Sequence, residues 1–190
     1  LRSLLLSGRV GMFGVEIGHT GQAIFFVVYG WTGGETNTKV AARTDDLCSA
    51  IFAEQLLYPG VPMCIAGDIN CLTTKRPHLA MLTSNKHGWT DLGAKASHWG
   101  GIDEQGTCRA PDSNTYHRRD VIIVNPLFFS LVHNFDIDHD LFSVHATLTI
   151  EFNTEPDTHI KKNLMPKSLS DQLEEQFETT LPEDCAQSMS

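Results

Sequence analysis

The sequence predicts an α/β fold, in which strands and helices form separate layers. An apolar run rich in β-branched and aromatic residues, "QAIFFVVYG" at 22–30, is typical of a buried strand. Apolar residues then recur at helical spacing between 38 and 58, and a second apolar run, "VPMCIAGD", follows at 61–68. Strand, helix and strand in this order indicate a layered unit. A hydrophobic content of 41% in 190 residues is enough for one domain core with an extension.

The first half of the chain supplies the other elements of this unit. The segment "GRVGMFGVEIG" at 8–18 is expected to pair with 22–30 as a hairpin through "GHTGQ". A loop rich in Gly and Thr, "WTGGETNT", separates that hairpin from the helix, and "YPGVP" ends the helix. The apolar positions that define the helix are Val40, Leu47, Ile51 and Leu56.

The second half alternates between short elements and loops. A shorter helix is expected over 77–86, followed by two loops, "HGWTDLG" and "HWGGIDEQGT". The segment "RRDVIIVN" at 118–125 predicts a third strand, which Pro126 ends, and "FSVHATLTIEF" at 142–152 alternates as a fourth.

The chain changes character after Phe152. We expect two parts, a domain at 1–152 and an acidic linker with an amphipathic tail helix at 153–190. In the tail, Ser168 and Asp171 form a candidate capping pair. The helix either docks on the domain or becomes ordered only on a protein partner. The apolar stripe of the helix is narrow and the rest is acidic, which favours the partner. The stripe consists of Leu169, Leu173, Phe177 and Leu181.

Charge and composition limit the classes of function. The net charge is −9, but residues 1–150 hold 14 acids and 11 bases, whereas 151–190 hold 9 acids and 3 bases. The acidic tail therefore argues only weakly against a nucleic-acid substrate.

No apolar run is long enough for a transmembrane helix. Five cysteines without a CxxC pair indicate reduced thiols in an intracellular protein. The opening "LRSLLLSGRV" has no initiator Met and too short an apolar run for a signal peptide, so we expect a fragment of a longer chain.

Polar residues follow the second buried strand at a place where packing does not explain them. Asp68 and Asn70 alternate with Ile69, so both side chains would point to one face if the strand pleat continued. A carboxylate and an amide would then stand side by side at the rim of a sheet. The alternative is an Asx turn, in which such residues bond their own backbone.

Two further polar residues occur in the other predicted strands. Asp120 opens the third strand, and His145 lies early in the fourth, among apolar neighbours. A carboxylate on one imidazole nitrogen would fix the tautomer and raise the basicity of the ring. The alternatives are a core histidine for His145 and a salt bridge from Asp120 to Arg118 or Arg119.

The order of the motifs "VVYGWTGG", "IAGDIN", "RRDVIIVN" and "VHATLTIEF" resembles the endonuclease/exonuclease/phosphatase superfamily. Within that superfamily the likeness is greatest to the endonucleases of non-LTR retroelements, and it covers about residues 8–152. The resemblance implies the C-terminal portion of a four-layer αββα sandwich with two mixed or antiparallel sheets. It also implies Mg²⁺-assisted hydrolysis of a phosphate ester, with Mn²⁺ as an alternative metal.

The resemblance assigns a role to each matching residue. Tyr29 matches a phosphate-contacting Tyr, and Asp68 matches the acid that orients or deprotonates the attacking water. Asn70 matches an amide that holds the scissile phosphate, and Asp120 matches the acid that orients the catalytic histidine. His145 matches that histidine. His139, in "DIDHD", is a competitor, but an alternating strand follows His145 and not His139.

The sequence also departs from the family pattern. Val144 stands where the family usually has Asp, and the early strands that carry the principal metal-ligating Glu are missing. Glu16 and Glu35 do not lie in the matching context, so no certain metal ligand is assigned, and Mg²⁺ binding is expected to be weak or absent in this chain. The missing N-terminal segment would be a necessary partner.

Three functions follow from these expectations. The first is an endonuclease-like phosphodiester hydrolase that acts on nucleic acid and is incomplete in this chain. The second is a degenerate, non-catalytic module that acts through its tail. The third is a phosphoesterase for lipid or inositol phosphates. Trp31, Trp89 and Trp99 lie in predicted loops and could stack on a base or contact lipid, but ordinary anchoring of the loops is the preferred interpretation.

Overall fold

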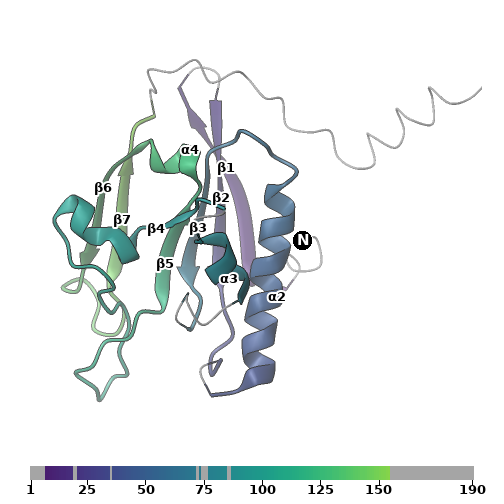
Figure 1. Ribbon diagram of the computed structural model, residues 1–190. Coiled ribbons are helices and arrows are strands. Elements are labelled where there is room, and N and C mark those ends of the chain that lie inside the picture. Colours follow the sequence, from purple (N-terminus) through teal and green to yellow (C-terminus); the bar gives the residue numbers. More distant parts are fainter. Residues whose placement is uncertain are drawn as a thin grey trace, which may run out of the picture.

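Figure 1 presents a computed structural model of the chain, in which a layer of helices and two β-sheets lie side by side. The structure describes residues 7–18, 21–34, 36–71, 73, 77–84 and 87–154. Three predictions lie outside these residues: the linker beyond 154, the tail helix with its capping pair, and the context of Glu35. The division of the chain at 152 stays a prediction.

The larger sheet has five strands in the order β1-β2-β3-β5-β4. The hairpin predicted at its edge is confirmed, since β1 (Val10–Ile17) pairs antiparallel with β2 (Gly21–Tyr29). β2 pairs in parallel with β3 (Met63–Asp68), and β3 pairs antiparallel with β5 (Asp120–Val124). The parallel step needs a crossover, which the predicted helix supplies.

Two helices cover one face of this sheet (Figure 1). α2 (Thr38–Gln55) begins at Asn37, whose side chain accepts hydrogen bonds from two backbone N–H groups of the first turn. α3 (Pro77–Leu82) follows β3 and is shorter than predicted. The apolar residues that the helices bury against alternate positions of the central strands include Leu47, Ile51, Leu79, Phe26, Val28, Ile65 and Ile123.

A two-stranded antiparallel sheet covers the other face. It consists of β6 (Val132–Asp138) and β7 (Thr147–Phe152). The core between the sheets includes Cys64, Ile122, Val124, Phe128, Phe135 and Ile150. Phe128 belongs to α4 (Pro126–Phe129), the short helix that follows β5. The described residues thus form three layers, helix, sheet and sheet, as a mixed α/β fold.

Two predictions about the second half are wrong, and one further element was not predicted. "HGWTDLG" is not only a loop, because Thr90–Asp91 forms β4 at the edge of the larger sheet, and Trp89 is buried in the core at 6% exposure. The segment 93–99 forms a 3₁₀ helix, η2 (Gly93–Trp99), which ends at Gly100 with a left-handed backbone. The last strand begins at Thr147 rather than 142, so His145 precedes it.

Two further findings concern the thiols and the helices. Cys48, Cys64, Cys71 and Cys108 carry no disulfide, and burial raises the pKa of Cys64 to about 12. Among the described residues, no helix has the length and apolar character needed to cross a bilayer.

Candidate active site

The register of the larger sheet sets three polar side chains in one row. Tyr29 of β2 is the partner of Asp68 of β3, and Asp68 is the partner of Asp120 of β5. Partners in register point to the same face of a sheet, and residues two apart on one strand share that face. Cys64 and Ile122 belong to the core between the sheets, so the row lies on the face toward β6 and β7. Tyr29 ends β2, Asp68 ends β3 and Asp120 begins β5. The row therefore crosses the strands at one end of the sheet.

Two glycines allow the end of β3 to lie directly against the end of β2. Gly67 has a φ of +140°, and a Cβ there would stand 2.0 Å from the carbonyl oxygen of Val28. A Cβ on Gly30 would stand 2.5 Å from the carbonyl oxygen of Ile69. The Gly30 N–H donates to the Asp68 carbonyl oxygen at 2.7 Å. Glycine is required at both positions because only a backbone without Cβ can approach so closely.

The chain turns sharply after Asp68, so the prediction that the pleat continues to Asn70 is wrong. Asn70 has a left-handed backbone, with φ of +52°, and its N–H donates to Asp68 Oδ1 at 2.7 Å. This is the Asx turn that the sequence left open. Asn70 is 6% exposed, and its Nδ2 donates to the Gly30 carbonyl oxygen at 3.1 Å. In this arrangement Asn70 fixes the turn that carries Asp68.

His145 lies against the carboxylate of Asp120. Its Nδ1 is 3.1 Å from Oδ2 and 3.2 Å from Oδ1 of Asp120. A ring that donates its Nδ1 hydrogen to this carboxylate keeps Nε2 as an acceptor. His139 lies elsewhere, with its Nε2 3.0 Å from Gln105 Nε2 and its ring 4.5 Å from the ring of Tyr116. The geometry therefore favours His145 over His139.

A short connecting segment, Thr107 and Cys108, holds Asp120 and His145 together. The Thr107 hydroxyl accepts from the N–H groups of Arg119 and Asp120, at 3.1 and 2.9 Å, and Thr107 is fully buried. The Thr107 carbonyl oxygen accepts from Ala146 N–H at 2.6 Å. One residue thus joins the beginning of β5 to the segment that carries His145.

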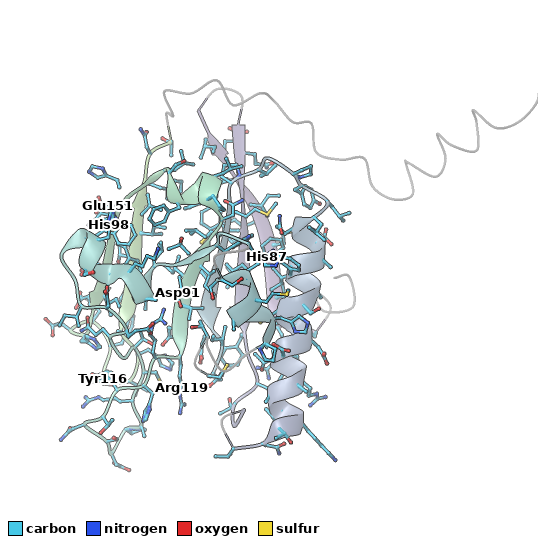
Figure 2. All side chains as sticks on the ribbon, in the orientation of Figure 1. His87, Asp91, His98, Tyr116, Arg119 and Glu151 are labelled. Atoms are coloured by element: carbon cyan, nitrogen blue, oxygen red, sulfur yellow. The ribbon has the colours of Figure 1, made fainter. Side chains whose placement is uncertain are left out.

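Asp120 does not form the predicted salt bridge with Arg118. The Arg118 guanidinium instead pairs with the buried carboxylate of Asp91 and, at 2.8 Å, with Glu104. Figure 2 labels Asp91 near the centre of the view, with Arg119 below it. Arg118 therefore does not compete with His145 for the Asp120 carboxylate, whereas the alternative pairing with Arg119 stays a prediction.

The carboxylates and the imidazole form a cluster that could hold a cation. One ligand atom from each of Asp68, Asp120 and His145 lies within 4.8 Å of the others. Burial raises the pKa of Asp68, and the nearby charge of Asp120 adds to this effect, whereas the Asn70 N–H, His145 and Arg119 oppose it. Two carboxylates and an imidazole suit Mg²⁺ less well than Mn²⁺ or Zn²⁺, which accept nitrogen ligands readily. A divalent cation would relieve the crowding of negative charge, so the donor set fits a metal.

The remaining predicted residue, Tyr29, is half exposed in the row. The Arg9 guanidinium lies over its ring, 4.8 Å from the centroid, and also 5.3 Å from the ring of Trp31. This pairing adds a cation beside the row that the sequence did not indicate, because Arg9 is far from every motif. Trp31 and Trp99 pack against the two cores. Together with the buried Trp89, they support the interpretation of loop anchoring.

Sequence reasoning also missed Cys108. It lies on an isolated bridge with His145, and its Sγ is 3.5 Å from His145 Nε2. No local pattern could have indicated it, because the contact joins residues 37 positions apart.

No protein-family model matches the sequence, and no curated protein matches it. Solved structures do match its fold. The 3′ phosphatase NExo from Neisseria, bound to product DNA hairpin, aligns with a TM-score of 0.59 and 16% identity over 76% of this chain and 65% of that chain. The endonuclease domain of TRAS1, a telomere-specific non-LTR retrotransposon, gives a TM-score of 0.56 and 15% identity, with 78% and 63% covered.

The catalytic domain of APE2 from Xenopus laevis gives a TM-score of 0.53 and 18% identity, with 83% of this chain and 62% of that chain covered. The chain thus spans less than two thirds of the length of each of these structures. Identities this low show the fold alone. The chain therefore shares the fold of these nuclease and phosphatase structures, which is the fold that the sequence resemblance predicted.

Proposed function

We propose that this chain carries active-site residues of a divalent-metal-dependent phosphodiester hydrolase that acts on DNA. The observation that carries the proposal is the contact of Asp120 with His145 Nδ1, in a cluster with Asp68 at one end of the larger sheet. Nuclease and phosphatase activities named for the structural neighbours support a phosphoesterase, and the DNA in the NExo complex supports this substrate.

Each residue has a role that its surroundings support. Asp68, whose pKa is raised by burial, would orient or deprotonate the attacking water when ionised. Asp120 would fix His145 so that Nε2 faces the reacting phosphate. A divalent cation held by the carboxylates of the cluster, with His145 left free for the reaction, would stabilise charge on the phosphate oxygens. Asn70 would position Asp68 through the turn, and its direct contact with the phosphate stays a prediction. Tyr29 and the cation of Arg9 would contact the phosphate at the other end of the row.

The experiment is hydrolysis of fluorescent DNA, double- and single-stranded and with a 3′ phosphate, in Mg²⁺ or Mn²⁺, by the 190-residue chain. His145→Ala and Asp68→Asn should each lower the rate at least 100-fold, as expected for loss of an acid–base group. The matched controls are His133→Ala and Asp136→Asn, which alter exposed residues of β6 and should leave the rate unchanged. Equal rates in all four variants would refute the proposal. Hydrolysis of inositol phosphates but not of DNA would show that the substrate is an inositol phosphate and not DNA.

Two features favour the second candidate, a non-catalytic module. Val144 stands beside His145 in place of the family Asp, and the Cys108 thiol lies against the ring nitrogen that the reaction needs. If the chain is a non-catalytic module, millimolar Mg²⁺ should leave the melting temperature of the chain unchanged. A rise in melting temperature that Asp68→Asn abolishes would exclude it.

A further inference from the structure

We propose that Arg9, Trp31, Lys39 and Arg43 form a binding surface for the phosphodiester backbone of a DNA strand. This arginine–tryptophan surface holds phosphates beside the one that is hydrolysed, and it binds them without contacting the bases. The link to hydrolysis rests on the proposed function, whereas the binding can be measured in the absence of metal and of any reaction.

Two arginines from distant parts of the chain meet on one tryptophan. The Arg9 guanidinium lies over the Trp31 ring, 5.3 Å from the ring centroid, and the Arg43 guanidinium lies over the same ring at 5.5 Å. Arg9 also lies 4.8 Å from the ring centroid of Tyr29, which belongs to the row. A guanidinium that lies over an aromatic ring keeps N–H groups at its edge, and these can grip a phosphate as a fork. The surface therefore adjoins the row through Arg9.

Hydrogen bonds to the backbone hold this arrangement between the sheet and α2. The Trp31 N–H donates to the hydroxyl of Thr44 at 3.1 Å, and Thr44 is 1% exposed. Nη1 of Arg9 donates to the Gly30 carbonyl oxygen at 3.2 Å. The beginning of α2 accordingly lies at the same end of the molecule as the end of β2 (Figure 1). Because these groups are fixed in advance, little conformational entropy is lost when a phosphate binds.

The cations of this surface lack acidic partners. Among the ion pairs of the described residues, none includes Arg9, Lys39 or Arg43. Lys39 and Arg43 are exposed and lie four residues apart on α2, so they share one face of the helix. Like charges at this spacing destabilise a helix slightly, and a bound polyanion would offset that cost. Three unpaired cations in a chain of net charge −9 are thus a local reversal of charge that suits phosphates.

The position of the tryptophan favours contact with the backbone of DNA over stacking on its bases. The Trp31 ring carries both guanidinium groups and is partly buried against the core under α2. A base could stack on the indole only by displacing a guanidinium or a core side chain. The arginine edges, in contrast, are suited to phosphate oxygens. Binding should therefore persist when the bases are removed, unlike binding by proteins that stack bases on exposed aromatic rings.

The test is fluorescence anisotropy of a labelled single-stranded DNA with the 190-residue chain, in EDTA and at increasing salt. Arg43→Gln and Lys39→Gln should each reduce the slope of log affinity against log salt by about 0.7. An abasic strand of equal length should bind within about twofold of the normal strand, whereas stacking on Trp31 would make it bind at least about fivefold more weakly. The matched control is Lys95→Gln, which removes an exposed cation of η2 and should keep the wild-type slope.

The outcomes separate this surface from the proposed function. The surface is overturned if the wild-type chain does not bind the strand at low salt, if Arg43→Gln keeps the wild-type slope, or if the abasic strand binds at least about fivefold more weakly. Salt-dependent binding with the expected changes in the variants, but without hydrolysis, retains the surface and refutes the hydrolase. In a chain that hydrolyses DNA, Arg43→Gln should raise KM and leave kcat unchanged. Hydrolysis with an unchanged KM retains the hydrolase and refutes the surface.

Discussion

Replacing Arg118 by Met should destabilise the domain by several kcal/mol. Only 4% of the Arg118 side chain and 5% of the Asp91 side chain is exposed, and the two form an ion pair. Removing one partner of a buried pair leaves the other charge uncompensated, which typically costs about 3–5 kcal/mol. The second partner, Glu104, has 56% of its side chain exposed, so this contact contributes no more than about 1 kcal/mol.

The assay is urea unfolding at neutral pH, followed by circular dichroism. The free energy of unfolding of a single domain is about 5–15 kcal/mol, so Arg118→Met should lose a third or more of it. Glu104→Gln, the control, should remain within about 1 kcal/mol of wild type. The double variant Arg118→Met/Asp91→Leu should recover most of the loss, because it removes the stranded carboxylate. A single variant that unfolds like wild type, or a double variant no better than the single one, would refute the assignment of the pair as a buried unit.

Three other substitutions test the parts of the site. Thr107→Val removes the hydroxyl that accepts from the N–H of Asp120, so the rate of DNA hydrolysis should fall about tenfold and Thr107→Ser should restore it; equal rates in both variants would show that the hydroxyl has no positioning role. Burial raises the pKa of Asp68 above its value in the unfolded chain, so the stability that this carboxyl contributes is present below the unfolded pKa and is lost as pH rises through the folded pKa. Asp68→Asn should therefore be more stable than wild type at neutral pH, with the difference developing at acidic pH above about 4, and urea midpoints that show the reverse order would contradict this sign. Gly67→Ala should destabilise by at least about 1–3 kcal/mol, because its Cβ would meet the Val28 carbonyl oxygen, and an unchanged thermal midpoint would contradict the close approach of β2 and β3.

The elements that the sequence predicted are those with an unbroken local pattern. The strands β2, β3 and β5 have continuous apolar runs, the helix α2 has apolar residues at helical spacing, and β1 is joined to β2 by a short Gly-containing turn. β6 was not predicted because its alternation is interrupted by an irregularity between Val132 and Asn134, where the register with β7 shifts. β4 has two residues, and it buries a charged side chain, Asp91, whose partner lies 27 positions away. No local window contains that information.

The candidate site was predictable to the extent that strand ends determine it. Asp68 and Asp120 end and begin neighbouring strands, so sheet pairing alone sets them opposite each other. The orientation of Asn70 was not predictable from the pleat, because the Asx turn to Asp68 competes with continued extension. Its left-handed backbone follows from that turn, and the amide then bonds Gly30 rather than continuing the row.

The position of His145 depends on a segment outside both sheets. β5 and β7 belong to different sheets, and the histidine precedes β7, so sheet pairing alone does not bring it to Asp120. Thr107 makes this connection, with its hydroxyl on the backbone of β5 and its carbonyl oxygen on Ala146. The same segment places Cys108 against the other nitrogen of the ring. A two-residue connection thus fixes the imidazole between a carboxylate and a thiol.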